Sequence, residues 1–132
     1  MTTGLSTQVI VAGAGPVGLV AALMLATVLE KRGSLNTASK ASTFHPPTLE
    51  ILDALGVLKA VMPEAEIVRT IQYRTPDGPF ATFSLSDLAA RTRFPFRMHL
   101  EQARLTPHLL TEILAYPNAR VLFDTEFRTL EQ

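Results

Sequence analysis

Three glycines near the start of the chain have the spacing of a nucleotide-binding turn. The stretch GAGPVG begins at Gly13 and fits the pattern G-x-G-x-x-G. In that pattern Gly13 allows a sharp exit from a strand, Gly15 lets a pyrophosphate approach the backbone, and Gly18 lets a helix pack closely on the strand. Pro16 and Val17 complete the turn, where the free N–H groups and the dipole of a helix start attract a diphosphate. We expect these five residues to bind the ADP half of a dinucleotide.

An acidic residue follows at the end of the second apolar run. The carboxylate of Glu30 can accept hydrogen bonds from both hydroxyls of an adenosine ribose, and a charged hydrogen bond of this kind contributes roughly 1.5–3 kcal/mol. The same carboxylate repels a 2′-phosphate, which argues against NADP at this position. We also expect Lys31 to contact the cofactor. A glutamate that only faces solvent is the alternative interpretation.

The pattern of apolar residues predicts the strands and the helix that position these residues. Residues 8–12 are β-branched and predict a strand buried on both faces, residues 17–26 predict a helix, and residues 27–30 predict the end of a second strand. Glu30 lies 12 residues beyond Gly18, whereas the acidic residue normally lies about 20 residues beyond the motif. We therefore expect residues to be missing from the sequence between Ala26 and Thr27.

The rest of the chain alternates between predicted helices and strands. Two stretches predict helices, residues 47–58 with Gly56 as C-cap and residues 101–115. Strands are predicted at residues 67–74, 80–85 and 119–123, with a further one starting near residue 126, and residues 31–43 form a polar loop. Asp77 and Gly78 stand between two predicted strands, so we interpret them as a hairpin turn with no part in cofactor binding.

Composition excludes several classes of function. The chain has 132 residues, enough for one domain, and 12 basic residues balance 12 acidic ones, so no overall field attracts nucleic acid or anionic lipid. The absence of cysteine excludes disulfides and thiolate chemistry and suits a reducing, cytoplasmic location. The apolar residues 9–29 are interrupted by glycines and a proline, which favours strand, turn and helix over a membrane span. No metal site is expected, because the histidines lack ligand spacing; these are His45, His99 and His108.

Three stretches in order resemble the flavoprotein aromatic hydroxylases, the para-hydroxybenzoate hydroxylase-like monooxygenases. They are residues 9–32, residues 40–57 (KASTFHPPTLEILDALGV) and residues 99–110 (HLEQARLTPHLL). The resemblance implies that the glycines line the FAD pyrophosphate and that Glu30 takes the ribose. It also implies that Lys40, where the family usually has an arginine, and Gln102 contact the cofactor near its ribityl–phosphate region.

The resemblance implies an α/β fold, a Rossmann-like FAD-binding βαβ domain with the start of an inserted β-rich substrate domain. The expected boundaries are residues 1–65 for the FAD-binding βαβ portion, 66–98 for the β-hairpin segment of the substrate domain and 99–132 for the return to the FAD-binding domain. Only about the N-terminal third of such an enzyme is covered, and two later motifs that hold FAD and NAD(P)H have no counterpart. We expect the 132-residue chain to be incomplete and inactive alone.

The implied function is that of an FAD-dependent monooxygenase that uses NAD(P)H and O2 to hydroxylate a small aromatic or related ring compound. No side chain is assigned as a catalytic acid or base, because the flavin carries the chemistry. Two alternatives remain: an NAD-binding dehydrogenase module, and a non-catalytic remnant of the FAD-binding fold. The sequence leaves open the substrate, the choice between NADH and NADPH, and the oligomeric state.

Overall fold

The chain forms two compact units, which we describe separately. The structure is a computed structural model and describes residues 9–25, 27–38, 40–117 and 119–129. One unit comprises Met1–Ala38 with Ala103–Gln132, and the other comprises Ser39–Gln102. The expected boundaries at residues 1–65, 66–98 and 99–132 remain a prediction.

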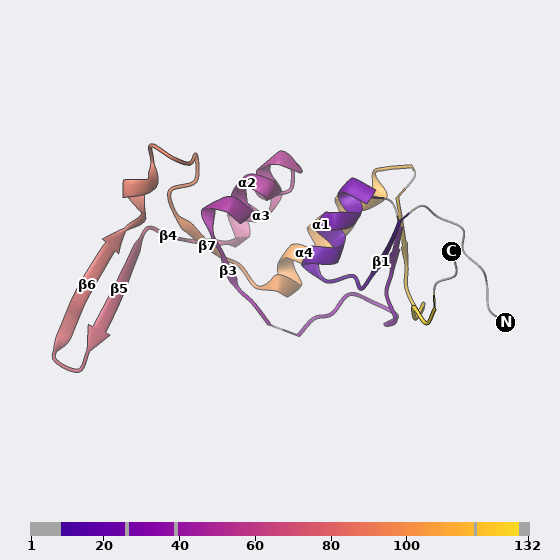
Figure 1. Cartoon of the computed structure of the whole chain (residues 1–132), viewed down its shortest axis with the longest axis horizontal. Coiled ribbons are helices and arrows are strands. Elements are labelled where there is room, and N and C mark those ends of the chain that lie inside the picture. The colour runs from indigo at the N-terminus through magenta and orange to yellow at the C-terminus, as the bar shows by residue number, and fades with distance from the viewer. Residues whose placement is uncertain (1–8, 26, 39, 118, 130–132) are drawn as a thin grey trace. The chain divides into compact units, whose positions relative to one another are not determined.

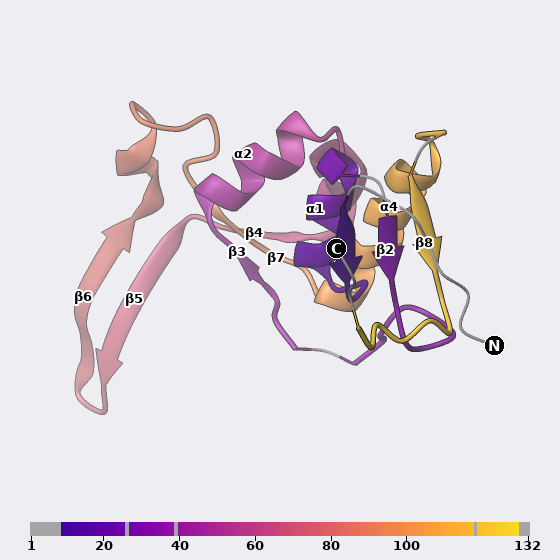
Figure 2. The same cartoon turned by 45° about the vertical axis from the view of Figure 1, so that its right-hand side comes forward.

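The first unit is a parallel βαβ fold. The strands β1 (Ile10–Ala12), β2 (Thr27–Leu29) and β8 (Arg120–Leu122) form one sheet in the order β1-β2-β8, and both pairs are parallel (Figures 1 and 2). The helix α1 (Pro16–Leu25) links β1 to β2 and contacts both strands. This parallel unit with its crossover helix confirms the predicted α/β fold class.

The core of the first unit comes from apolar residues on three elements. Leu19 of α1 and Val28 of β2 are fully buried. The helix α4 (Gln102–Leu114) buries one side, because residues four apart share a helix face; the fully or almost fully buried members are Leu105, Leu109 and Ile113. Burying each such side chain contributes roughly 1.5–3 kcal/mol. The middle strand β2 and the helices α1 and α4 therefore supply the buried core of the first unit.

The strand β1 departs from the prediction that it is buried on both faces. Ile10 and Val11 are half-buried and Ala12 is exposed. Among the described strands, β1 pairs with β2 alone and so lies at one edge of the sheet. A β-branched run predicts burial from its composition, but burial on both faces also requires elements packed against each face, and an edge strand has fewer neighbours that shield its side chains.

The second unit has an antiparallel sheet backed by helices. The strand β7 (Arg97–His99) lies between β3 (Thr43–Phe44) and β4 (Glu66–Val68). Three short helices lie between β3 and β4 along the chain: α2 (Pro46–Ala54), α3 (Leu58–Val61) and the 3-10 helix η1 (Met62–Glu64). The core of this unit consists of apolar side chains that are fully or almost fully buried, and these include Leu49, Leu52, Val57, Leu58, Val61 and Met98.

The helix predicted over residues 47–58 is two helices. Gly56 has a φ of +76° and ends α2 as predicted. Its N–H donates to the Asp53 carbonyl (2.9 Å) and the Val57 N–H donates to the Leu52 carbonyl (3.0 Å), which is the Schellman pattern. The predicted helix extends beyond this cap because Val57 and Leu58 continue the apolar spacing of α2. Both residues instead belong to the buried core of the second unit.

The strand predicted over residues 67–74 is also divided. It breaks at Arg69 into β4, which pairs with β7, and β5 (Thr70–Thr75), which pairs with β6 (Gly78–Ser84). The β5–β6 hairpin turns through Pro76 and Asp77, as predicted, and the 3-10 helix η2 (Leu85–Leu88) follows it (Figure 1). The alternation of residue types along the sequence continues across Arg69, but the paired strand changes there from β7 to β6.

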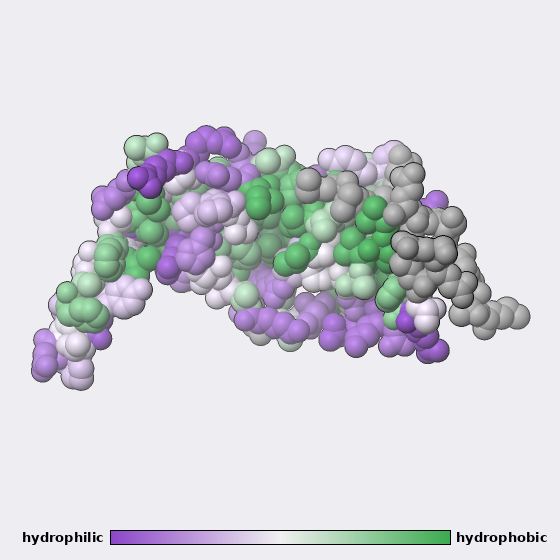
Figure 3. All heavy atoms as spheres, in the orientation of Figure 1, coloured by the Kyte–Doolittle hydropathy of each residue, from purple (hydrophilic) through white to green (hydrophobic). Residues whose placement is uncertain are grey.

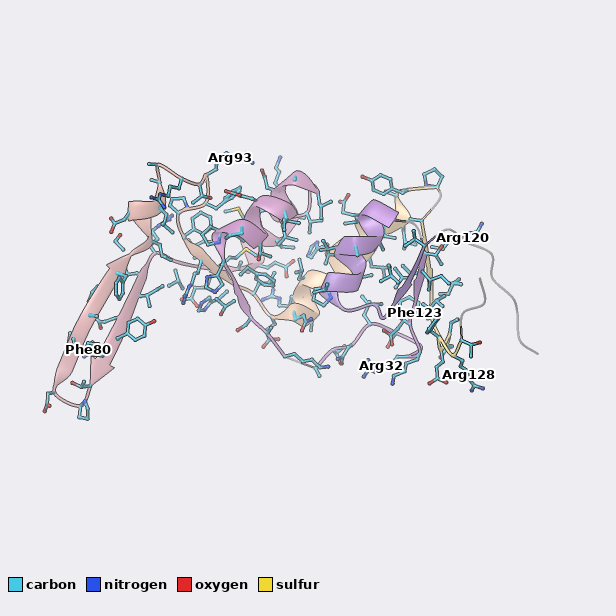
Figure 4. All side chains as sticks on the ribbon, viewed as in Figure 1. Arg32, Phe80, Arg93, Arg120, Phe123 and Arg128 are labelled. Carbon is cyan, nitrogen blue, oxygen red and sulfur yellow. The ribbon has the colours of Figure 1, made fainter. Side chains whose placement is uncertain are left out.

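One face of the hairpin carries exposed aromatic rings. Tyr73 lies 6.1 Å from Phe80 and 5.9 Å from Phe83 between ring centroids. Phe80 projects from β6 in Figure 4, and apolar residues stand out on the hairpin in Figure 3. Together with Ile71 and Ala81 these rings line a shallow, open hollow.

The structure tests the strand expected near residue 126, whereas the discontinuity expected before Thr27 falls on a residue outside the described ranges. The strand expected from residue 126 is wrong for residues 126–129, which form no helix or strand. The expected discontinuity before Thr27 involves Ala26, which lies outside the described residues. None of the helices in the described ranges is long and apolar enough to cross a membrane.

Candidate functional site

The three glycines of the first turn occupy three different environments. Gly13 has a φ of +108°, which permits the sharp exit from β1. A Cβ on Gly18 would lie 2.1 Å from the Gly13 carbonyl oxygen and 3.3 Å from Cγ1 of Val11, so α1 packs closely on β1 only because this residue is glycine. A Cβ on Gly15 would meet nothing within 4 Å, so the space beside it is open to a ligand.

The start of α1 presents backbone donors beside this open space. The Leu19 N–H donates to the Gly15 carbonyl at 2.9 Å. Pro16 occupies the first helical position and has no N–H, and Val17 after it is 82% exposed. Backbone N–H groups in the first turn of a helix lack intrahelical partners. The turn therefore offers the N–H groups of Val17 and Gly18 to an anion, which the helix dipole also favours.

Glu30 lies directly beside the glycine turn, as predicted. It follows β2, whose parallel pairing with β1 places Leu29 opposite Ala12. One carboxylate oxygen, Oε2, accepts a hydrogen bond from the Ala14 N–H at 2.9 Å, and the other, Oε1, accepts one from the Arg32 N–H at 3.0 Å. A carboxylate has about four lone-pair positions. Two therefore remain for the hydroxyls of a ribose, while the first two fix the orientation of the side chain.

The surroundings of Glu30 keep it ionised. Its pKa is lowered from the ordinary value of 4.5, first by the Ala14 N–H and then by the Arg32 N–H. Burial of the residue, which is only 7% exposed, opposes this shift, and the positive charges of Arg32 and Lys31 add to it. A buried carboxylate with two backbone donors is a strong acceptor at neutral pH.

The charged neighbours of Glu30 interact with it weakly. Nη1 of Arg32 lies 3.8 Å from Oε1 of Glu30, and the Arg32 side chain is 53% exposed in the loop after β2 (Figure 4). An ion pair at this distance with one exposed partner is weakened by solvent, and pairs at the protein surface contribute about 0–1 kcal/mol. Lys31 is exposed. The backbone of this loop therefore holds the carboxylate more firmly than its side chains do.

A segment that is distant in the sequence is hydrogen-bonded to Glu30 and to the loop that follows it. The N–H of Thr125 donates to the Glu30 carbonyl at 2.9 Å, and the N–H of Asp124 donates to the Arg32 carbonyl at 3.0 Å. Asp124 adopts a φ of 51°, and its carboxylate lies about 3.1 Å from the position of a Cβ on Gly33. Sequence reasoning missed these residues, because no local pattern connects positions more than 90 residues apart.

The remaining candidate residues, Lys40 and Gln102, lie in the second unit. The Gln102 N–H donates to the carbonyl of Ala41, next to Lys40, at 3.0 Å, and the Leu100 N–H donates to the Ser42 carbonyl at 2.9 Å. Lys40 is exposed and Gln102 is half-buried. The structure therefore brings the segments of these two residues side by side, as expected of two residues that contact the same region of a cofactor. Their role in binding remains a prediction.

No cluster of side chains in the described ranges indicates a metal site. The structure shows no group of three or more histidine or acidic side chains that could hold an ion there. The start of α2, which follows His45, offers few free donors because its first two residues are prolines and the N–H groups of Thr48 and Leu49 donate to the His45 carbonyl. The glycine turn with Glu30 is therefore the best-formed site for an anionic ligand that bears hydroxyls.

The comparison with protein families agrees with this geometry. A family model described as an FAD binding domain matches residues 6–132, nearly the whole chain. The chain belongs to this FAD-binding domain family. The match confirms the predicted resemblance and decides against an NAD-binding dehydrogenase module.

Individual relatives come from the monooxygenases. The chain is 28% identical over 131 residues to para-nitrophenol 4-monooxygenase of a Pseudomonas species, which covers 94% of this chain and 32% of the relative. It is 31% identical over 125 residues to 6-hydroxy-3-succinoylpyridine 3-monooxygenase of Pseudomonas putida, covering 89% and 32%. The crystal structure of p-nitrophenol 4-monooxygenase from Pseudomonas putida superposes with a TM-score of 0.87 at 26% identity, covering 96% of this chain and 34% of that one. The chain thus spans about a third of the length of these relatives.

Proposed function

We propose that this chain is the nucleotide-binding part of an FAD-dependent monooxygenase that uses NAD(P)H and O2 to hydroxylate an aromatic ring. The observation that carries the proposal is the placement of the Glu30 carboxylate beside Gly13–Gly18, with two backbone donors and two free acceptor positions. The family match and the monooxygenase relatives support FAD as the ligand.

The residues of the turn fit the ADP half of FAD. The open space beside Gly15 admits the pyrophosphate, the N–H groups of Val17 and Gly18 donate to its oxygens, and Glu30 accepts from the ribose hydroxyls. Pro16 fixes the helix start, and Lys31 adds positive charge nearby. Lys40 and Gln102 contact the middle part of the cofactor in this proposal, on the basis of the family resemblance.

Bound FAD supplies the chemistry, since a flavin reduced by NAD(P)H activates O2 and transfers one oxygen atom to the ring. The side chains of this chain bind and orient the cofactor. The relatives act on a nitrophenol and on a hydroxypyridine according to their names, so we propose a hydroxylated aromatic or heteroaromatic substrate. A cytoplasmic location is part of the proposal, and a chain without cysteine, which forms no disulfide, suits such a reducing compartment.

Titration of the 132-residue chain with ADP and with FAD tests the proposal. Isothermal calorimetry or NMR detects ADP binding even at millimolar affinity. Replacement Glu30→Ala removes a charged hydrogen-bond acceptor worth roughly 1.5–3 kcal/mol, so we expect the affinity for ADP to fall about 10- to 100-fold. The matched control is Asp87→Ala, which removes an exposed carboxylate from η2 and leaves the affinity unchanged. Equal ADP affinity in the Glu30 variant contradicts the role proposed for Glu30. No nucleotide binding at all contradicts the whole proposal and favours a non-catalytic remnant.

A further inference from the structure

The sheet of the second unit has one apolar face and one polar face. Met98, in the middle of β7, is fully buried. Side chains alternate along a strand, so Arg97 and His99 project from the opposite face. The antiparallel register places His99 between Thr43 of β3 and Glu66 of β4, with all three on this polar face.

Arg97 stands out on the polar face because its guanidinium has no hydrogen-bond or ion-pair partner among the described residues. The side chain is half-buried, and its Nε is buried without a hydrogen-bond acceptor among the described residues. No carboxylate in the described ranges forms an ion pair with its terminal nitrogens, which reach the surface. A partly desolvated cation without a counter-ion is unfavourable, and an anion at its outer edge would offset the cost.

The ordinary interpretation is that this face is simply exposed to water, as one face of an antiparallel sheet often is. Arg91 illustrates that case, because it is exposed in the loop before β7. Arg97 differs, since its inner nitrogen is shielded from water and its neighbour across the strand pair is the apolar Val68. The low polarity around its inner edge strengthens any charge interaction at its outer edge.

We propose that Arg97 and His99 form an anion-binding site on the polar face of the β3–β7–β4 sheet, and that its ligand is the carboxylate group of the aromatic substrate. Arg97 offers a planar pair of donors that matches two oxygens, and His99, two residues along the same strand, offers a further ring N–H. Glu66 lies directly opposite His99 and is the one acidic side chain that the register places on this face. Its charge weakens anion binding.

The position of the site agrees with a substrate role, and this step rests on the proposed function. Gln102 follows β7 closely in the chain, and its backbone pairs with that of Ala41, beside Lys40. The residues assigned to the substrate therefore lie on β7, which precedes Gln102, a residue assigned to the middle of FAD, by only a few positions in the chain. A nucleotide diphosphate carries the same anionic oxygen chemistry, so the experiment must separate the two sources.

The test uses the 132-residue chain labelled with ¹⁵N, titrated separately with benzoate, its neutral isostere benzamide, and ADP. The Nε–Hε signal of Arg97 and the ring signals of His99 report binding by NMR. We expect benzoate to shift both sets of signals and to bind at least tenfold more tightly than benzamide. Arg97→Met should weaken benzoate binding at least tenfold, Arg91→Met is the matched control with no effect, and Glu66→Gln should strengthen binding.

Separate readouts distinguish this site from the nucleotide site. Equal affinity for benzoate and benzamide overturns the inference, and so does a loss of ADP affinity in Arg97→Met, which would assign the arginine to the cofactor. Retained ADP binding without benzoate binding defeats this inference alone, whereas benzoate binding without ADP binding defeats the proposed function and, with it, the assignment of the anion site to a substrate. If Arg97→Met fails to fold, Arg97→Lys and Glu66→Gln carry the test, with a partial loss expected for the first and a gain for the second.

Discussion

The chain contains two turns that combine glycine with a nearby acidic residue, and the structure gives them different surroundings. The first turn runs from Gly13 to Gly18, and the second is the hairpin turn that ends at Gly78. In both a glycine has a positive φ, +108° for Gly13 and +131° for Gly78. Positive φ therefore accounts for the presence of glycine in both turns and does not separate a binding turn from a connecting one.

The two turns differ in what surrounds them. The first lies between a strand and a helix that packs on it, and the buried Glu30 accepts a hydrogen bond from its backbone. The hairpin turn joins two antiparallel strands, and Asp77 in it is exposed. The first turn, which we propose as the nucleotide site, therefore differs from the hairpin turn by close helix packing, open donors and a carboxylate placed by a neighbouring parallel strand.

The largest effect should come from filling the close contact in the first turn. Gly18→Ala places a Cβ 2.1 Å from the Gly13 carbonyl oxygen, which is backbone and cannot rotate away. We expect α1 to be displaced from β1 and the free energy of unfolding to fall by about 2–3 kcal/mol, as for other overpacked cores. Urea denaturation followed by circular dichroism measures this change.

Gly15→Ala is the control for this substitution. Its new Cβ meets nothing within 4 Å, so the stability should change by less than about 0.5 kcal/mol, while the affinity for ADP should fall because the methyl group takes the space of the pyrophosphate. Equal destabilisation by the two substitutions would show that close packing does not distinguish Gly18 from Gly15.

The first turn was predictable from sequence because its requirements are local. Each glycine has its own geometric task, and Glu30 follows the strand that pairs with β1. The Ala14 N–H that holds the carboxylate, and the segment at Asp124 that closes the loop, depend on pairing between distant parts of the chain. The break at Arg69 was missed for the same reason, because local alternation continues while the partner strand changes.

An intermediate effect should appear when the pH is lowered. The pKa of Glu30 is depressed in the folded chain, chiefly by the Ala14 and Arg32 N–H groups, so its ionised form stabilises the fold above the ordinary value of 4.5. That contribution is lost as the pH falls through the depressed pKa. We expect the wild-type chain to be more stable than Glu30→Gln at pH 7 and the difference to shrink below pH 4.5.

Urea denaturation of both proteins at a series of pH values between neutral and acidic measures this difference. The Asp77→Asn variant serves as the control, because it makes the same kind of replacement at an exposed carboxylate outside the first turn. A difference between wild type and Glu30→Gln that stays constant as the pH falls would mean that the charge of Glu30 does not stabilise the first turn.

The smallest effect should come from the hairpin turn, where Asp77→Ala removes the acidic side chain of the second turn. Asp77 is exposed, and the turn is held by the pairing of Thr75 with Gly78 and by a hydrogen bond from the Thr75 hydroxyl to the Gly78 carbonyl at 3.2 Å. Neither interaction uses the carboxylate, so the stability should change by less than about 0.5 kcal/mol. The affinity for ADP should not change, because the proposed nucleotide site does not include Asp77. Paired ADP titrations of Asp77→Ala and Glu30→Ala make the comparison directly. A loss of ADP affinity in Asp77→Ala as large as that in Glu30→Ala would assign a nucleotide-binding role to both turns, and the distinction drawn from their surroundings would then be wrong.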